Sequence, residues 1–331
     1  MKVVITGGGG FIGSQLAKRL SAEGSRVGPS GSQEKIDTVL LFDSHFPESL
    51  QDNPPPNTTL FEGDLSARNA TFAAIDRDDI AVFHLAAMVS GECEERFDDA
   101  LSVNLNGTQN ILEALRAREG TPRVVFASSV GTYGGEEMPD IVGDFTKQTH
   151  LTNYGMSKVL GEQLINDYSR KGFLDGRSVR LPTVIIRPGK PNAAAASWAS
   201  GMFREPLNGE TCYLPVHRDQ CHPVIGYRDV VESFIALEEA NSSLLGSDRA
   251  FVLPSHRISV AEAITMLEQV ADEQNRPLGM VMDEFDPVIQ GIVDTWPTAT
   301  DGTRALRLGV PEPKPVKDII RDYIEDFLPK S

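Results

Sequence analysis

The chain has 331 residues, of which 40% are hydrophobic and 24% charged, as is ordinary for a soluble globular protein with one large domain or two lobes. Its formal net charge of −16 argues against a nucleic acid or an anionic membrane as partner, because both demand a basic face. Three cysteines are too few for a disulfide framework, and no apolar run approaches the about 20 residues that span a bilayer. We therefore expect a reduced, cytoplasmic protein.

The first half of the chain alternates between strand-like and helix-like segments. We expect strands at residues 2–6, 38–43, 57–65, 81–87, 123–129 and 178–188. Helices are expected between them, at residues 11–20, 68–76, 100–118 and 154–171. Residues 28–35 are expected to form a flexible loop. Such alternation predicts an α/β fold with a doubly wound, parallel sheet of the Rossmann type.

The pattern becomes less regular after residue 188. A small, irregular run begins there, and further on we expect helices at residues 227–240, 260–274 and 316–327 and a strand at 250–253. This predicts a Rossmann domain over residues 1–188 and a smaller, mainly substrate-binding lobe over residues 189–331. Residues 222–254, approximately, are expected to return to the Rossmann domain.

A glycine-rich turn follows the first strand and precedes a helix, the context in which such loops bind a dinucleotide pyrophosphate. Two registers fit, Gly8-x-Gly10-x-x-Gly13 and Gly7-x-x-Gly10-x-x-Gly13. Asp43 ends the second long strand, where a carboxylate can accept hydrogen bonds from both adenosine ribose hydroxyls and would repel a 2′-phosphate. The predicted cofactor is therefore NAD rather than NADP. Asp64 and Leu65 either contact the adenine or form a plain turn.

Tyr154 and Lys158 lie one helical turn apart and therefore on one face of the predicted helix. An ammonium close to a phenol favours the phenolate, so we expect Lys158 to lower the pKa of Tyr154 towards the working range. A phenolate beside a nicotinamide is a suitable base for an alcohol that loses hydride. Ser129, at the carboxyl end of a strand, can hydrogen-bond the reacting oxygen.

These residues, with His84-Leu-Ala-Ala87 and Asn104, resemble the extended short-chain dehydrogenase/reductase family, which includes nucleotide-sugar epimerases. The resemblance implies that Ser129, Tyr154 and Lys158 are catalytic, that Asn104 braces Lys158 through water, and that the Gly7 register is the functional one. It also implies a homodimer formed by the helices around residues 104–116 and 154–168. The predicted cofactor-binding residues are Gly7, Gly10, Phe11, Ile12, Gly13, Asp43, Asp64, Leu65, Leu85, Ala86, Ala87, Asn104, Tyr154, Lys158 and Pro188.

The substrate lobe offers polar groups that can meet a carboxylate and several hydroxyls. The predicted substrate-binding residues there are Lys190, Asn192, Ser197 and Arg204, together with Ser129 and Tyr154. Residues 164–173, 180–192 and 199–209 resemble the D-erythronate dehydrogenase branch of the family, which implies NAD-dependent oxidation of the C2 hydroxyl of D-erythronate or a close aldonic acid to the 2-oxo acid.

Three other interpretations are open from the sequence. A nucleotide-sugar 4-epimerase or dehydratase would need basic groups for a diphosphate, and residues 190–228 offer four cations. A non-catalytic dinucleotide sensor commonly lacks the Tyr/Lys pair that this chain has. A metal site could be imagined at Cys212, His217, Cys221 and His222, but their spacing is not that of a standard zinc site, and we predict no metal.

Overall fold

The computed structural model describes residues 1–191 and 196–329. Within them, seven parallel strands form a central sheet in the order β13-β9-β7-β6-β1-β4-β5. The strands in chain order are β1 (Lys2–Thr6), β4 (Thr38–Asp43), β5 (Thr58–Glu62), β6 (Ile80–His84), β7 (Arg123–Ser129), β9 (Asp175–Leu181) and β13 (Ala250–Val252). The order reverses direction between β1 and β6, so the carboxyl ends of these two strands flank the crevice where such sheets bind ligands.

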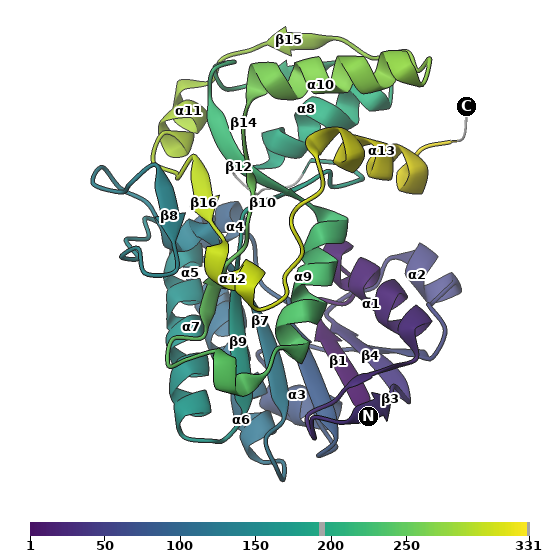
Figure 1. Cartoon of the computed structure of the whole chain (residues 1–331), viewed down its shortest axis with the longest axis vertical. Helices are drawn as coiled ribbons and strands as arrows, with labels where there is room; N and C mark the ends of the chain where they lie inside the picture. The colour runs from purple at the N-terminus through teal and green to yellow at the C-terminus, as the bar shows by residue number, and fades with distance from the viewer. Residues whose placement is uncertain (192–195, 330–331) are drawn as a thin grey trace.

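Helices cover both faces of this sheet (Figure 1). Alternate residues of a strand point to opposite faces, so Val3 and Ile5 of β1 pack with α1 (Phe11–Glu23) and α9 (Tyr227–Glu239). Val4 packs on the other face, with α6 (Gly107–Arg116) and α7 (Asn153–Arg170). The predicted α/β, doubly wound fold is confirmed.

A smaller lobe lies above the carboxyl ends of the strands in Figure 1. It consists of the sheet β10-β12-β14, the pair β11-β15, and helices packed around a separate hydrophobic core. Its elements are β10 (Thr183–Ile185), α8 (Ser197–Leu207), β11 (Cys212–Leu214), β12 (Cys221–Gly226), β14 (His256–Ser259), α10 (Val260–Glu273), β15 (Val281–Asp283), α11 (Pro287–Val293) and α13 (Val316–Phe327). Between β12 and β14 the chain contributes α9 and β13 to the central sheet. The predicted domain boundaries themselves stay a prediction.

Shorter elements complete the chain. They are β2 (Ser25–Val27), β3 (Gln33–Lys35), α2 (Glu48–Asp52), α3 (Arg68–Ala74), α4 (Ser90–Glu95), α5 (Phe97–Ala100), the 3₁₀ turns η2 (Val130–Thr132) and η3 (Ser242–Leu244), β8 (Ile141–Gly143), β16 (Ala299–Asp301) and α12 (Thr303–Arg307). No helix among the described residues is long and apolar enough to cross a bilayer.

Three local predictions are wrong. Residues 28–35 are not wholly a loop, because β2 and β3 form an antiparallel hairpin that closes at Gly31, whose φ is 78°. Residues 178–188 are not one strand: Pro182 lacks the N–H that a ladder needs, and β9 ends before it while β10 pairs in the other sheet. The irregular run contains α8, most of whose residues are buried, Trp198, Ala199, Met202 and Phe203 among them.

The predicted helix over residues 100–118 is interrupted. The segment η1 (Leu101–Asn106) is π-helical and connects α5 to α6. Such wide turns often mark functional sites, because they displace a side chain from regular helical spacing. Here the displaced segment carries Asn104, which is buried.

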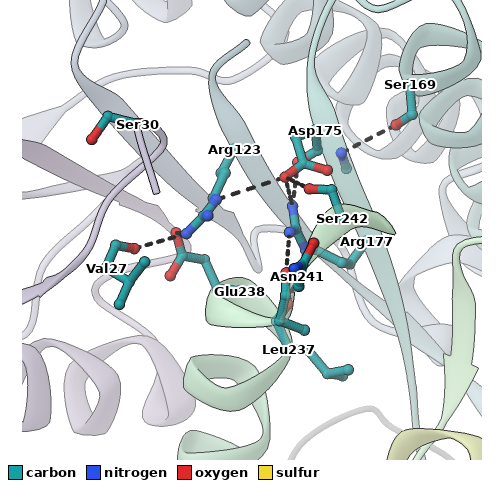
Figure 2. A network of polar contacts seen from close by, with 12 residues as sticks. Val27, Ser30, Arg123, Ser169, Asp175, Arg177, Leu237, Glu238, Asn241 and Ser242 are labelled. Atoms are coloured by element: carbon teal, nitrogen blue, oxygen red, sulfur yellow. Dashed lines mark hydrogen bonds and ion pairs between the residues drawn. The ribbon is translucent and has the colours of Figure 1, made fainter. Parts of the chain in front are cut away.

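An ionic network is buried at the amino ends of β7 and β9, away from Ser129 at the other end of β7 (Figure 2). Asp175 receives Nη1 of Arg177 at 2.8 Å and Nη1 of Arg249 at 2.6 Å. Arg123 Nη1 donates to the carbonyl of Val27 at 2.7 Å and lies 3.6 Å from Glu238. The network therefore joins β2, β7, β9 and α9.

Candidate active site

The glycine loop between β1 and α1 is shaped by close backbone approach. Gly7 has a φ of 71°, and a Cβ there would lie 2.8 Å from the amide nitrogen of Ala86. A Cβ on Gly13 would lie 2.2 Å from the carbonyl oxygen of Gly7. Neither position admits a larger residue, and together they bring the first-turn amides of α1, at Phe11 and Ile12, to the carboxyl end of β1. This cradle fits a dinucleotide pyrophosphate.

Asp43 lies beside this loop at the end of β4. Its Oδ2 accepts a hydrogen bond from the Gly9 amide at 2.9 Å, and its Oδ1 accepts one from the Ser44 amide at 2.7 Å. The carboxylate is half-buried and held between the loop and the strand end, a position that suits a ribose diol. In contrast, both Asp64 oxygens bind Ser66, and the Leu65 side chain is buried.

The segment after β6 forms the wall opposite the glycine loop, as Gly7 approaches both Leu85 and Ala86. His84 at the end of β6 fixes it through a buried chain of hydrogen bonds. Thr108 donates to the carbonyl of Asn104 at 2.6 Å, so it accepts from His84 Nε2–H at 2.9 Å. Burial and the charge of Lys158 lower the pKa of His84 to about 3, so its ring is neutral. With the ring hydrogen on Nε2, His84 Nδ1 accepts a hydrogen bond from the Thr6 hydroxyl at 2.7 Å.

Ser129 and Tyr154 meet where β7 ends and α7 begins. Ser129 Oγ accepts the Gly131 amide at 3.0 Å, so its hydroxyl hydrogen can donate, and it does so towards Tyr154. Gly155 permits this contact between elements, because a Cβ there would lie 2.2 Å from the carbonyl oxygen of Gly131. Thr152 caps α7 by accepting the Gly155 amide at 3.0 Å.

The expected low pKa of Tyr154 is corrected by the structure. Burial raises the pKa of Tyr154 to about 12, a nearby Ser129 hydroxyl lowers it and Cys93 raises it. Lys158 Nζ lies 5.4 Å from the Tyr154 ring centroid. Burial lowers the pKa of Lys158 to about 8, so removal from water opposes both charges before any ligand arrives.

Lys158 was expected to be braced by Asn104 through water, and its direct contacts are with other residues. Its Nζ donates to the carbonyl of Ala127 at 2.7 Å and lies 4.8 Å from the centroid of Phe126. Asn104 Oδ1 accepts the Met88 amide at 2.8 Å, and its Nδ2 reaches Ser157 at 3.5 Å. Asn104 thus ties η1 to the wall after β6, and its link to Lys158 through water stays a prediction.

Sequence reasoning missed a buried pair on the same face of α7. Glu162, one turn beyond Lys158, accepts from Ser128 at 2.5 Å and pairs with Arg180 Nη2 at 2.7 Å. Arg180 also donates to the hydroxyl of Tyr133 at 2.7 Å. The pair anchors α7 to β7 and β9 beside Ser129. The spacing of Tyr154, Lys158 and Glu162 was the available signal.

A cavity of about 800 Å³ opens between the central sheet and the smaller lobe, with Ser129 and Tyr154 in its lining. The lobe contributes a mostly apolar wall and a few polar groups. These lining residues are Thr183, Arg187, Ser197, Ser200, Arg204, His222, Val288, Ile292 and Trp296. Two of the predicted catalytic residues, Ser129 and Tyr154, and part of the lobe therefore face one cavity, whose lining does not include Lys158 or Asn104.

The predicted substrate residues have different positions relative to this cavity. Ser197 and Arg204 are in its lining. Lys190 is exposed and is not among the lining residues, and neither is Pro188, the half-buried residue predicted to bind the cofactor. Asn192 lies outside the described residues. The predicted substrate residues did not include Arg187, Thr183 or His222, which also line the cavity; the pairing of β10 with β12 brings Thr183 to His222.

The cysteine and histidine residues of the smaller lobe have packing roles. His222 Nε2 binds the hydroxyl of Thr183 at 2.5 Å, and Cys212 is buried in the lobe core. Within residues 1–191 and 196–329, no group of three or more histidine, cysteine, aspartate or glutamate side chains is arranged to hold a metal ion.

Comparison with known proteins extends this description. Residues 3–248 match the NAD dependent epimerase/dehydratase family. A protein of Cupriavidus necator named D-erythronate dehydrogenase is 41% identical over 326 residues, which cover 98% of both chains. A protein of the same name from Haemophilus influenzae is 39% identical and covers 98% of this chain and 99% of its own.

Solved structures agree with this family assignment. The nucleoside-diphosphate-sugar epimerase of Agrobacterium tumefaciens superposes with a TM-score of 0.88 at 34% identity, over 100% of this chain and 95% of its own. The GalE-like L-threonine dehydrogenase of Cupriavidus necator shares the fold, with a TM-score of 0.82 at 22% identity over 99% of this chain and 100% of its own. The chain thus belongs to the NAD-dependent epimerase/dehydratase family of extended short-chain dehydrogenases/reductases and is an oxidoreductase that uses a nicotinamide cofactor.

Proposed function

We propose that this enzyme oxidises the C2 hydroxyl of a small sugar acid, D-erythronate or a close aldonic acid, to the 2-oxo acid with NAD. The observation that carries the proposal is the single cavity that Ser129 and Tyr154 share with arginine residues of the smaller lobe. The two similar proteins named D-erythronate dehydrogenase support the same substrate class. A hydroxy acid needs both features: a base for its hydroxyl and a cation for its carboxylate.

Each catalytic residue has one task in this proposal. Ser129 donates its hydroxyl hydrogen to the reacting oxygen and orients it towards Tyr154. Tyr154, as phenolate, takes the hydroxyl proton while the C2–H bond breaks, and the oxygen becomes the carbonyl of the 2-oxo acid. A bound nicotinamide supplies the positively charged acceptor for the hydride. Lys158 stabilises the phenolate electrostatically.

NAD is the proposed cofactor because of Asp43. Its carboxylate is fixed by the Gly9 and Ser44 amides beside the glycine loop. A second phosphate at the ribose would meet this negative charge, while a free diol can donate to it. The segment after Asp43, Ser44-His-Phe-Pro47, offers no lysine or arginine to bind a phosphate.

A nucleotide-sugar epimerase is the second candidate. The Agrobacterium structure with that name is 34% identical over the whole chain, and the cavity is large for a four-carbon acid. Its lining contains two arginine residues, which a diphosphate would also attract. One of the two is already paired with a carboxylate, which favours the smaller substrate.

A substrate panel separates the two candidates. Purified enzyme with NAD is given D-erythronate, its stereoisomers, five- and six-carbon aldonic acids, and UDP- and dTDP-sugars, and NADH formation and sugar conversion are followed. We expect NADH only with aldonic acids, and Tyr154→Phe to lower turnover by about 100-fold or more with little change in NAD affinity. Conversion of nucleotide sugars alone would refute the proposal, as would full activity of the variant.

A further inference from the structure

Arg187 lines the same cavity as Ser129 and Tyr154, and two residues of α8 form hydrogen bonds with its main chain. The Arg187 amide donates to Ser200 Oγ at 3.1 Å. Its carbonyl oxygen accepts from Nη1 of Arg204 at 3.0 Å. Ser200 and Arg204 are one turn apart on α8, so one helical face fixes both ends of the residue. The backbone position of Arg187 is therefore rigid, as a binding residue requires.

The two arginine residues differ in their charge balance. Nη2 of Arg204 lies 2.5 Å from Glu205, and its side chain is only 5% exposed. Arg187 is half-buried and forms no ion pair within the part of the chain that the structure describes; its Nη1 donates to the carbonyl of Lys190 at 2.8 Å. Burial and the charge of Arg204 both lower the pKa of Arg187. Among the described residues, its cation thus lacks an anionic partner, which a partly buried charge favours.

The rest of the cavity wall offers an anion few other favourable contacts. His222 is neutral because burial lowers its pKa to about 4. Glu94, an acidic lining residue, accepts the Asn153 amide at 2.8 Å and would repel a carboxylate. Trp296, Val288 and Ile292 offer apolar surface. A ligand with one negative end is therefore oriented with that end towards Arg187.

We propose that Arg187 binds the carboxylate of the substrate and that Arg204, paired with Glu205, positions it. The proposal deepens the proposed function and rests on it. A guanidinium matches a carboxylate with two parallel N–H donors, which fixes the direction of the bound acid as well as its presence. Lys190, whose side chain is exposed outside this lining, is not the anchor.

Arg187→Met, Arg187→Lys, Lys190→Met and Lys171→Met test the assignment in the full-length enzyme. Lys171 is an exposed cation just beyond α7 and serves as the control for lost surface charge. We expect Arg187→Met to raise KM for D-erythronate by about 10- to 100-fold, with KM for NAD unchanged, because a charge-assisted hydrogen bond is lost. Arg187→Lys should recover part of this loss, and the other two variants should resemble the wild type.

Binding measurements separate this inference from the proposed function. Calorimetric titration compares D-erythronate with erythritol, the polyol of the same chain length without a carboxylate. We expect the wild type to bind the acid more tightly and Arg187→Met to lose that preference. An unchanged preference in Arg187→Met, or no preference in the wild type, would overturn the assignment of Arg187. Failure of wild-type turnover with every aldonic acid would instead refute the proposed function.

Discussion

At the scale of single residues, burial disfavours the charged forms of two side chains of the site. Burial opposes a phenolate at Tyr154 and an ammonium at Lys158, while the proposed mechanism needs both at once. The free enzyme therefore holds Tyr154 as phenol at neutral pH. The fixed contacts of Lys158 with Ala127 and Phe126 keep the ammonium in position.

These pKa values predict a specific pH profile. Because the pKa of Tyr154 is about 12, the phenolate fraction rises with pH throughout the accessible range. Because the pKa of Lys158 is about 8, its ammonium is lost above that pH. Hence kcat/KM for the hydroxy acid should rise about tenfold per unit below pH 8 and level off above it. Initial rates at low substrate concentration between pH 6 and about 10 measure this.

The control is Lys158→Arg, whose cation does not titrate in this range. Its activity will be lower, but kcat/KM should keep rising through pH 8 because the levelling depends on the lysine ammonium. A wild-type profile that is flat between pH 6 and 8, or a break retained in Lys158→Arg, would contradict these roles.

At the scale of elements, the ionic network at the amino ends of β7 and β9 secures the sheet that carries the site (Figure 2). Burial alone would raise the pKa of Asp175, but the charge of Arg177 and hydrogen bonds from Ser242 and Arg249 hold it below its usual value. Arg177 itself donates to the carbonyl of Leu237 at 2.9 Å, which joins β9 to α9. Asp175 lies within 4 Å of three arginine residues, of which Arg123 also lies 3.6 Å from Glu238.

Asp175→Asn should lower the free energy of unfolding by about 3 kcal/mol, because it leaves buried guanidinium groups without their anion. The matched control Asp167→Asn removes an exposed pair with Arg170 and should cost less than about 1 kcal/mol. Because the folded pKa is depressed, the contribution of Asp175 is present above pH 4, approximately, and is lost as the carboxyl protonates below it. Urea denaturation at several pH values measures both effects. Equal losses from the two variants would contradict the account.

The sequence was sufficient to predict those elements that depend on a local residue pattern. The alternation of short buried strands with amphipathic helices predicted the sheet, and the spacing of Tyr154 and Lys158 predicted one helical face. The π-helical turn at Asn104 and the helix α8 were not predictable in this way, because tertiary packing decides both. Arg187 is the clearest case. Its importance depends on where Glu205 lies and on which chain segments enclose the cavity, and neither follows from neighbouring residues.

At the scale of the whole molecule, the central sheet and the smaller lobe have separate hydrophobic cores and contribute different groups to the site. The central sheet presents the glycine loop, Asp43 and Ser129 at the carboxyl ends of its strands, with Tyr154 beside them on α7, and the smaller lobe lies above these ends (Figure 1). The cavity between the two contains groups from both, so the proposed base Tyr154 and the proposed carboxylate anchor Arg187 belong to different parts of the chain. The homodimer that the family resemblance implies stays a prediction, which sedimentation measurements would test.

The central claim is that hydride leaves C2 of a sugar acid for the nicotinamide. The most direct measurement uses D-erythronate that carries deuterium at C2, with NAD and the purified enzyme, and mass spectrometry of the NADH formed; the acid labelled at C3 serves as control. We predict that the C2 label appears in NADH and that the C3 label does not. Unlabelled NADH from the C2-labelled acid, or transfer of the C3 label, would contradict the account.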